Sequence, residues 1–407
     1  MRILCLGMNY APEPIGIAVY TAGLAESLAA MGHEVEVVAA KPYYPEWRIA
    51  DGYRGPGSRT LENGVLVTRC PLYVPARPSG ARRILHHLSF ARAALGPMLG
   101  AARRLKPEIV LTVAPSLIAA PVARLAARRA GARSWLHVQD FEVEAAFATG
   151  LLDAASLSAR LARRFERKVM TGFDGVSSIS PEMCAKLESF GIPAGRIHEL
   201  RNWAETDTVR PLDGPSPFRA EWDIQTPHVA LYSGNIANKQ GVEILVEAAR
   251  LLQNRTDLTF VICGQGPNRA ALEASAAGLG NILFRDLQPA GRLGDLLGLA
   301  TIHLLPQKPA AADLVLPSKL TNMLASGRPV VATAAPGTGL AREIHGCGLA
   351  TPPEDAPAFA AAIARLIDEP ELHRALSLAA RERAEEAWSR PAIIAQFEAR
   401  LRALVED

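Results

Sequence analysis

The chain has 407 residues, more than a single hydrophobic core usually supports, so we expect two domains. Hydrophobic residues make up 49% of the chain and charged residues 21%, which excludes a disordered protein. The formal net charge of +3 gives no indication of nucleic-acid binding.

Cysteine spacing and hydropathy further restrict the class of protein. The five cysteines are far apart and include no C-x-x-C pair, which favours reduced thiols over a zinc site or disulfides. The apolar run after Met1 and Arg2 is too short for a signal peptide, and no segment approaches the ~20 apolar residues of a membrane span. We therefore expect a cytoplasmic protein that does not cross a membrane.

A βαβ unit opens the chain, with strands expected at 2–7 and 34–39 and a helix at 20–31. The loop before the helix contains no G-x-G-x-x-G, so an NAD-type dinucleotide site is not indicated. Gly16 lies just before the helix, where it either lets a ligand approach the helix N-terminus or only starts the helix.

The loop at 41–47 holds three aromatic residues after the second strand. Loops at the carboxyl ends of parallel strands often carry binding residues, and exposed aromatic rings suit a sugar or a lipid-linked acceptor. The alternative is a loop that packs onto its own rings. The candidates for acceptor binding are Tyr43, Tyr44, Glu46 and Trp47.

Residues 63–107 contain eight basic residues and no acidic one. A helix within this stretch also carries an apolar stripe, so the basic segment 77–107 is predicted to lie on an anionic membrane surface. A surface helix with solvated arginines is the alternative. The apolar positions are Ile84, Leu85, Leu88, Ala91 and Leu95, and the basic positions are Arg69, Arg77, Arg82, Arg83, Arg92, Arg103, Arg104 and Lys106.

His137 and Asp140 lie at the carboxyl end of a predicted strand, which makes them candidates for catalysis. A histidine in the core of the sheet is the alternative for His137.

A segment rich in Pro, Asp and Thr at 203–227 is expected to link the two domains. The expected strands of the two halves are 108–113, 133–138, 175–179, 196–202, 229–232, 259–263, 281–285, 301–305 and 329–333, and the expected helices are 116–130, 156–172, 318–326, 356–368, 371–387 and 391–405.

Two strand-to-helix turns of the second half are candidate anion sites. The first runs through Gly234 and Asn235 to Asn238, a plausible N-cap, and Lys239 near the start of a helix, where free N–H groups and a cation attract an anion. In the second, Ser318 is expected to cap a helix with Lys319 in its first turn, which an anionic ligand would compensate. Solvated lysines on ordinary turns are the alternative. Gly264 and Gly266, in a third turn, are needed for its geometry and are secondary candidates for ligand contact.

Six groups of residues carry a resemblance to a known family. They are Asn9-Tyr10-Ala11-Pro12-Glu13 with Gly16, Gly32-His33-Glu34-Val35, Pro42-Tyr43-Tyr44-Pro45-Glu46-Trp47, His137-Val138-Gln139-Asp140, Ser233-Gly234-Asn235 with Lys239-Gln240-Gly241, and Pro317-Ser318-Lys319 with Ala325-Ser326-Gly327-Arg328-Pro329. Together they make nearly the whole chain resemble the family 4 retaining glycosyltransferases of GT-B fold, within them the subgroup that builds exopolysaccharides such as colanic acid.

The resemblance implies an α/β fold with two Rossmann-like domains that face each other across a cleft. The acceptor-side domain would span 1–203, the nucleotide-sugar-binding domain 204–385, and a final helix, 386–407, would cross back to the first domain. No cofactor is expected. The expected partners are a UDP- or GDP-sugar and a lipid-linked saccharide acceptor. The basic segment 77–107 adds the inner face of the cell membrane.

The family's functional residues can be carried over by position. Lys239 would hold the donor diphosphate, Gly16 would approach it from the other domain, and His137 with Asp140 would lie near the transferred sugar. The family often has an Arg where this chain has Asn235. Its Glu-x7-Glu motif falls on Leu314 and Asn322, with Asp313 adjacent. The donor-binding set is therefore Gly16, Gly234, Asn235, Lys239, Gly264, Gly266, Asp313, Ser318, Lys319 and Asn322.

The missing motifs suggest the mechanism. No Asp-x-Asp pair is present to hold a divalent metal, so Lys239, Lys319 and helix N-termini are expected to stabilise the departing nucleoside diphosphate. No carboxylate pair of the hydrolase type is evident, and the family resemblance implies retention at the anomeric carbon. The alternatives are a sugar-nucleotide epimerase of the same fold and a two-lobed binding protein without catalysis.

Overall fold

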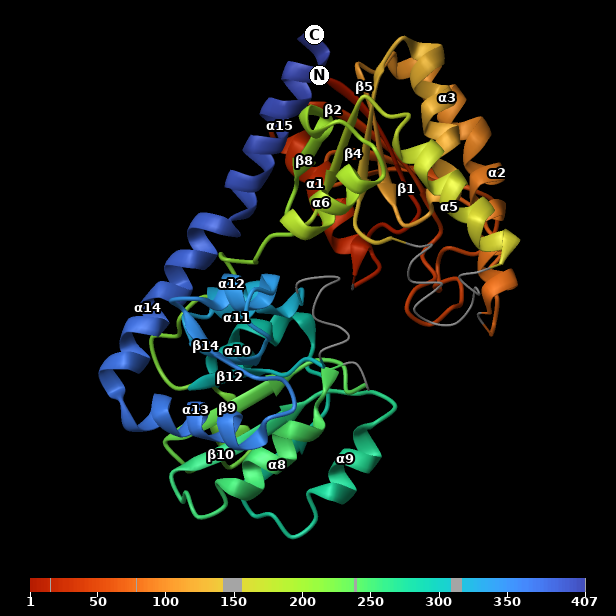
Figure 1. Cartoon of the computed structure of the whole chain (residues 1–407). Coiled ribbons are helices and arrows are strands. Elements are labelled where there is room, and N and C mark those ends of the chain that lie inside the picture. The colour runs from red at the N-terminus through yellow and green to blue at the C-terminus, as the bar shows by residue number, and fades with distance from the viewer. Residues whose placement is uncertain (15, 78, 142–155, 238–239, 309–316, 407) are drawn as a thin grey trace. The chain divides into compact units, whose positions relative to one another are not determined.

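The computed structural model describes residues 1–14, 16–77, 79–141, 156–237, 240–308 and 317–406. The chain forms two compact units: unit 1 is Met1–Arg201 with Ile393–Asp407, and unit 2 is Asn202–Ala392. Each unit has its own sheet with helices packed on it (Figure 1). The predicted fold class, two α/β domains, is therefore confirmed.

Unit 1 is built on an eight-stranded sheet in the order β3-β4-β2-β1-β5-β6-β7-β8. All neighbours are parallel except β3 and β4, which form an antiparallel pair. The sequence analysis did not predict this pair, and β3 is an exposed edge strand without an apolar face. The strands are β1 (Arg2–Gly7), β2 (Glu34–Ala40), β3 (Ser58–Glu62), β4 (Val65–Cys70), β5 (Ile109–Ala114), β6 (Arg133–Val138), β7 (Gly175–Ser178) and β8 (Ile197–Glu199).

The helices of unit 1 cover both faces of this sheet. Helices α2, α3 and α5 lie on one side, and α1 and α15 lie on the other (Figure 1). Right-handed crossovers place α1 on the opposite face from α2, α3 and α5. The chain moves one way along the sheet from β1 to β4, and it moves the opposite way from β4 to β8. The helices are α1 (Ile17–Ala30), α2 (Gly80–Leu105), α3 (Ala120–Ala130), α5 (Leu157–Met170) and α6 (Pro181–Ser189), with 3-10 turns η1 (Leu117–Ala119) and η2 (Ala194–Arg196).

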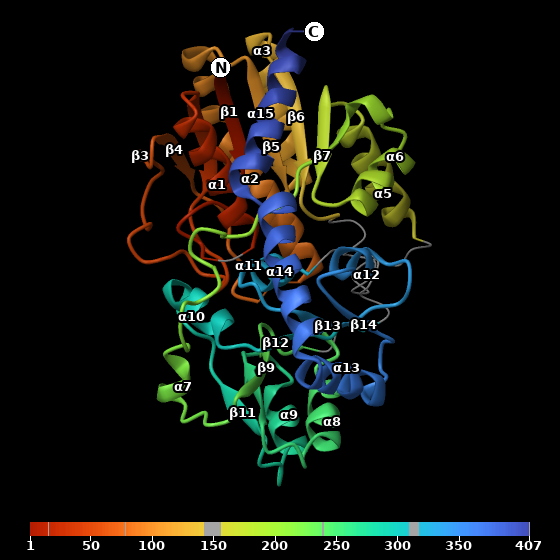
Figure 2. The same cartoon turned by 90° about the vertical axis from the view of Figure 1, so that its left-hand side faces the viewer.

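The last helix, α15 (Arg390–Glu406), belongs to unit 1 from Ile393 onward (Figure 2). Phe397 packs edge-on against Trp135 of β6, with ring centroids 5.2 Å apart. Glu398 Oε1 lies 3.0 Å from the Nε2 atom of buried His33. This aromatic pair and this polar pair, with the buried Ile394 and Leu401, therefore help to hold the helix on unit 1.

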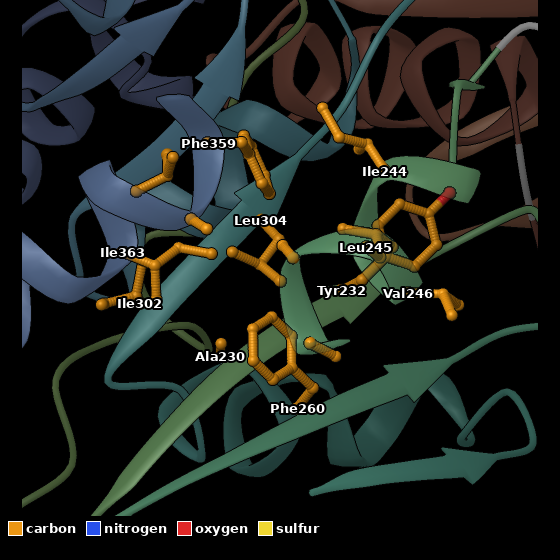
Figure 3. Packing of buried hydrophobic residues seen from close by; sticks show 14 of the residues in the cluster. Ala230, Tyr232, Ile244, Leu245, Val246, Phe260, Ile302, Leu304, Phe359 and Ile363 are labelled. Carbon is orange, nitrogen blue, oxygen red and sulfur yellow. The ribbon is translucent and has the colours of Figure 1, made fainter. Parts of the chain in front are cut away.

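Unit 2 has a parallel six-stranded sheet in the order β11-β10-β9-β12-β13-β14, with β9 near its centre. Tyr232 of β9, Phe260 of β10 and Leu245 of α8 meet in its core (Figure 3). The strands are β9 (His228–Ser233), β10 (Leu258–Cys263), β11 (Ile282–Arg285), β12 (Ile302–Leu305), β13 (Val330–Thr333) and β14 (Gly348–Thr351). The helices are α7 (Phe218–Glu221), α8 (Glu243–Leu251), α9 (Arg269–Ser275), η4 (Ala290–Arg292), α10 (Leu293–Gly298), α11 (Lys319–Ala325), α12 (Gly339–Ile344), α13 (Ala356–Asp368) and α14 (Pro370–Ala387).

The predicted linker, 203–227, is not a free connection. Ala204, Val209 and Phe218 are all buried, and they pack into the cores of unit 2. Its high content of Pro and Asp reflects irregular backbone, while a few widely spaced apolar side chains anchor it. The segment therefore belongs to unit 2.

In the described part of the chain, no helix is both long and apolar enough to span a bilayer.

Candidate active site

The turn after β9 packs closely against the turn after β10. Gly234 has a φ of 144°, a conformation that favours glycine, and its N–H donates to the carbonyl of Cys263 over 3.0 Å. The N–H of Ile236 donates to Gln265 O over 2.8 Å. The two turns therefore form one hydrogen-bonded surface at the carboxyl edge of the sheet.

Backbone packing accounts for the two glycines after β10. A Cβ atom at Gly264 would lie 2.0 Å from Gly234 O, and one at Gly266 would lie 2.1 Å from Ile236 O. Both positions thus need glycine whether or not a ligand is present. Their contact with a donor stays a prediction.

Lys319, the first residue of α11, reaches over β9. Its Nζ atom lies 4.1 Å from the centroid of the Tyr232 ring, and a Cβ atom at Gly234 would be 3.2 Å from that nitrogen. The nitrogen is buried and has no hydrogen-bond partner in the described part of the chain, although part of the side chain reaches the surface. Burial lowers the pKa of Lys319 to about 7. A buried cation without a partner indicates a site for an anion.

The two polar neighbours of Lys319 on α11 differ from expectation. Ser318 holds the N-cap position of α11, as predicted, but its backbone is helical and its side chain makes no capping hydrogen bond. Asn322 Oδ1 accepts a hydrogen bond from the backbone N–H of Glu205 over 2.9 Å. At least one end of the Asn322 amide is therefore used to hold the chain that leads into unit 2.

Two residues of the predicted donor set, and one expected helix cap, lie outside the described residues. Asn238, the expected cap, and Lys239 fall in 238–239, and Asp313 falls in 309–316, both outside the described residues. Their roles stay predictions.

In unit 1, Gly16 precedes α1 with a φ of 67°, and no atom lies within 4 Å of a Cβ built on it. No side chain caps the helix there. The position is thus open and requires glycine for its backbone, which is compatible with the predicted approach of a ligand.

Glu13 organises the loops around Gly16, and the sequence analysis did not assign it a role. Its Oε1 atom accepts hydrogen bonds from the backbone N–H groups of Tyr43 and Tyr44 over 2.9 and 3.0 Å, and its Oε2 atom accepts one from Asn9 Nδ2 over 2.8 Å. Burial raises the pKa of this carboxyl group above its ordinary value. The only signal in the sequence was its place in the Asn9 to Glu13 motif.

The aromatic loop is folded partly onto itself. Tyr43 is buried, and its ring lies edge-on to those of Trp47 and His86, with centroids 5.7 and 4.6 Å away. Tyr44 and Glu46 are exposed, and Trp47 is half-buried. Of the four predicted acceptor residues, Tyr43 has a clear packing role, while the other three remain accessible.

His137 lies within β6 and is buried, with its Nδ1 atom 3.0 Å from Ser177 Oγ. Burial lowers its pKa to about 3, so the ring is neutral at physiological pH. Asp140, three residues later, is exposed. His137 can therefore offer a hydrogen bond in a reaction but no charge.

Among the residues that the structure describes, no group of three His, Cys, Asp or Glu side chains is arranged to hold a metal ion.

The two units and their sites define a class of enzyme, and comparisons with known proteins agree on it. Solved structures with the same fold include sucrose-phosphate synthase from Thermosynechococcus elongatus, with a TM-score of 0.74, 19% identity and coverage of 99% of this chain and 98% of that one. Another is Anabaena Alr3699/HepE in complex with UDP-glucose, with a TM-score of 0.68, 16% identity and coverage of 99% and 100%. The fold is that of the GT-B glycosyltransferases.

Sequence comparisons identify the family within that class. Residues 16–203 match the glycosyl transferase 4-like domain, and residues 227–369 match the glycosyl transferases group 1 domain. The chain is 40% identical over 407 residues to the putative colanic acid biosynthesis glycosyl transferase WcaI of Escherichia coli (strain K12), with 98% of each chain covered. The chain belongs to this glycosyltransferase family, which confirms the predicted resemblance, and it is a glycosyltransferase.

The burial of Lys319 predicts how stability depends on pH without ligand. Below about pH 7 the native state carries the buried charge, and above the ordinary lysine pKa of about 10.4 neither the native nor the unfolded state is charged. Between these values the unfolded state binds more protons, so the contribution of Lys319 to the free energy of unfolding rises with pH. Lys319→Met should therefore be more stable than the wild type at pH 6, and the difference should shrink toward pH 10. Urea denaturation of both proteins at pH 6, 8 and 9 measures this, and a difference that is independent of pH would contradict it.

Proposed function

We propose that the protein transfers a sugar from a nucleoside-diphosphate sugar to a lipid-linked saccharide acceptor, with retention, in the synthesis of an exopolysaccharide or other surface polysaccharide. The relative WcaI is named for colanic acid biosynthesis, which supports the polysaccharide product. The complex of Anabaena Alr3699/HepE with UDP-glucose supports a nucleotide-sugar donor. A uridine or guanosine diphosphate sugar fits the same chemistry.

The observation that carries the donor assignment is the buried Lys319 ammonium group. It has no hydrogen-bond partner among the described residues, and the Tyr232 ring and the Gly234 turn lie beside it. A diphosphate would supply the missing negative charge in a site with little water, where such a pair is strong.

Catalysis in this proposal depends on charge at the leaving group. Negative charge grows on the diphosphate as the glycosidic bond breaks, so a fixed cation stabilises the transition state more than the ground state. Lys319 and Lys239 would supply this charge. In a same-face transfer the departing phosphate takes the proton of the acceptor hydroxyl, so no protein base is needed there. His137, which is neutral, would contribute hydrogen bonding to the transferred sugar, with Asp140 nearby.

The membrane proposal is confined to the first part of α2. Ile84, Leu85 and Leu88 are exposed at 51%, 52% and 49%, while the core side of the helix is filled by other residues. One predicted basic residue, Arg69, is not available for lipid, because it is fully buried beside Glu62. Arg104 is half-exposed but pairs with the buried Glu36 over 2.8 Å. We therefore propose that the N-terminal half of α2, with Arg82 and Arg83, rests on an anionic membrane as part of peripheral association with the inner face of the cell membrane.

The two alternatives from the sequence lose support. A non-catalytic binding protein and an epimerase would not be expected to match a glycosyltransferase over 98% of their length.

Loss of Lys319 or Lys239 should reduce turnover as well as donor affinity. By analogy with single oxyanion donors, Lys319→Ala and Lys239→Ala should each lower kcat on the order of 10²-fold. Steady-state kinetics with the productive donor, beside thermal melting, measure this, and Lys186→Ala in unit 1 is the matched control. A Lys319→Ala enzyme that melts normally and turns over at the wild-type rate would contradict the assignment.

Turnover should not require a divalent metal, because lysines are assigned the charge of the leaving group. Activity should persist in excess EDTA. An EDTA-sensitive activity that Mg²⁺ or Mn²⁺ restores would instead assign that charge to a metal ion.

A further inference from the structure

Helix α5 carries an exposed apolar pair that the sequence analysis did not single out. Leu161 and Phe165 are exposed at 59% and 39%. They are four residues apart, so they lie on the same face of the helix, one turn from each other. The pair is unusual because the buried face of α5 is supplied by other residues, including Ala159, Val169 and Met170.

The exposed charged side chains of α5 are all basic. The single acidic residue of α5, Glu166, is buried at 1% exposure. The exposed surface of the helix therefore presents apolar and basic groups and no carboxylate. The exposed basic residues of α5 are Arg160, Arg163, Arg164, Arg167 and Lys168.

Helix α5 lies on the same side of the unit 1 sheet as α2 (Figure 1). Both helices belong to the part of the chain that runs from β4 to β8, whose right-handed crossovers fall on one face of the sheet. The exposed apolar residues of α2, led by Ile84, Leu85 and Leu88, thus share a side of unit 1 with Leu161 and Phe165.

We propose that α5 is a second membrane-docking helix of unit 1. Leu161 and Phe165 insert at the boundary between headgroups and acyl chains of an anionic bilayer, and the surrounding arginines bind lipid phosphates. This inference rests on the proposed membrane contact of α2 and deepens it, since it names a second element and the residues that would act there.

Two arguments favour a bilayer as the occupant. An exposed surface with basic groups and no carboxylate complements a sheet of anionic headgroups. A single small apolar anchor also gives only marginal, reversible membrane binding, so stable association takes a second signal. Two apolar patches on one side of a unit meet that requirement together.

The test uses the full-length protein and vesicles of phosphatidylglycerol with phosphatidylcholine, beside vesicles of phosphatidylcholine alone. The α5 variant is Leu161→Ser with Phe165→Ser, and the α2 variant is Ile84→Ser with Leu85→Ser and Leu88→Ser. The matched control is Leu378→Ser on α14 in unit 2, a leucine exposed at 61%. Co-sedimentation gives the partition coefficient, and thermal melting with UDP binding reports the fold.

The α5 variant should bind anionic vesicles about tenfold more weakly or worse, because two apolar side chains no longer leave water. The α2 variant should also bind more weakly, and Leu378→Ser should bind as the wild type does. A separate variant, Arg160→Gln with Arg164→Gln, should reduce vesicle binding and the salt dependence of that binding. If the serine variant melts at a lower temperature than the wild type, this arginine variant tests the role of α5 instead.

The outcomes separate the two proposals. A wild type that ignores anionic vesicles removes the membrane contact of α2 and α5 together. A wild type that binds and loses binding only through α2 overturns the role of α5 alone. Equal binding to neutral vesicles overturns the role of the arginines. If the α5 substitutions dissolve a dimer and leave vesicle binding unchanged, the face is a contact between copies of the chain and the inference is wrong.

Discussion

The buried ammonium group of Lys319 on the ring of Tyr232 is the constraint on which the proposed donor site depends. Burial of a cation without a partner opposes folding, so the surrounding structure must hold it in place. Tyr232 is fixed in the core of unit 2, and its hydroxyl donates to Asn235 O over 2.5 Å. The buried charge therefore lowers the free energy of unfolding when no ligand is bound, and a bound anion would remove this loss.

Packing around the same buried lysine explains why the neighbouring turns contain glycine. Gly234 faces the Lys319 nitrogen, where a side chain would crowd it, and Gly264 and Gly266 let the neighbouring turn close against Gly234 and Ile236. In unit 1, Glu13 plays a comparable part, since one buried carboxylate joins the loops after β1 and β2. In both units a few buried polar groups set the backbone at the carboxyl edge of a sheet, where parallel α/β proteins bind ligands.

Most of the fold could be predicted because its signals are local. Buried apolar runs of four to six residues, spaced by helices, predicted most strands of both units but not β4 or β14, and Lys319 was visible as a cation at a helix start. Edge strand β3 could not be predicted, since its exposed side chains carry no apolar pattern. The burial of Arg69, the packing of 203–227 and the uncapped Ser318 depend on contacts between distant residues, which no local pattern encodes. The exposure of Leu161 and Phe165 likewise depends on which face of α5 the sheet buries.

Proton uptake on nucleotide binding tests the central claim most directly. Titration calorimetry of UDP binding in two buffers of different ionisation enthalpy counts the protons exchanged. If the diphosphate binds the Lys319 ammonium group, the complex at pH 8 should take up a large part of one proton, about 0.9 for a group with a pKa of about 7 that becomes fully charged. Uptake should fall toward pH 6, where the amine is already protonated, and it should be absent in Lys319→Met. Tight UDP binding at pH 8 with no proton uptake would show that the diphosphate is held without Lys319, and the account of the site would be wrong.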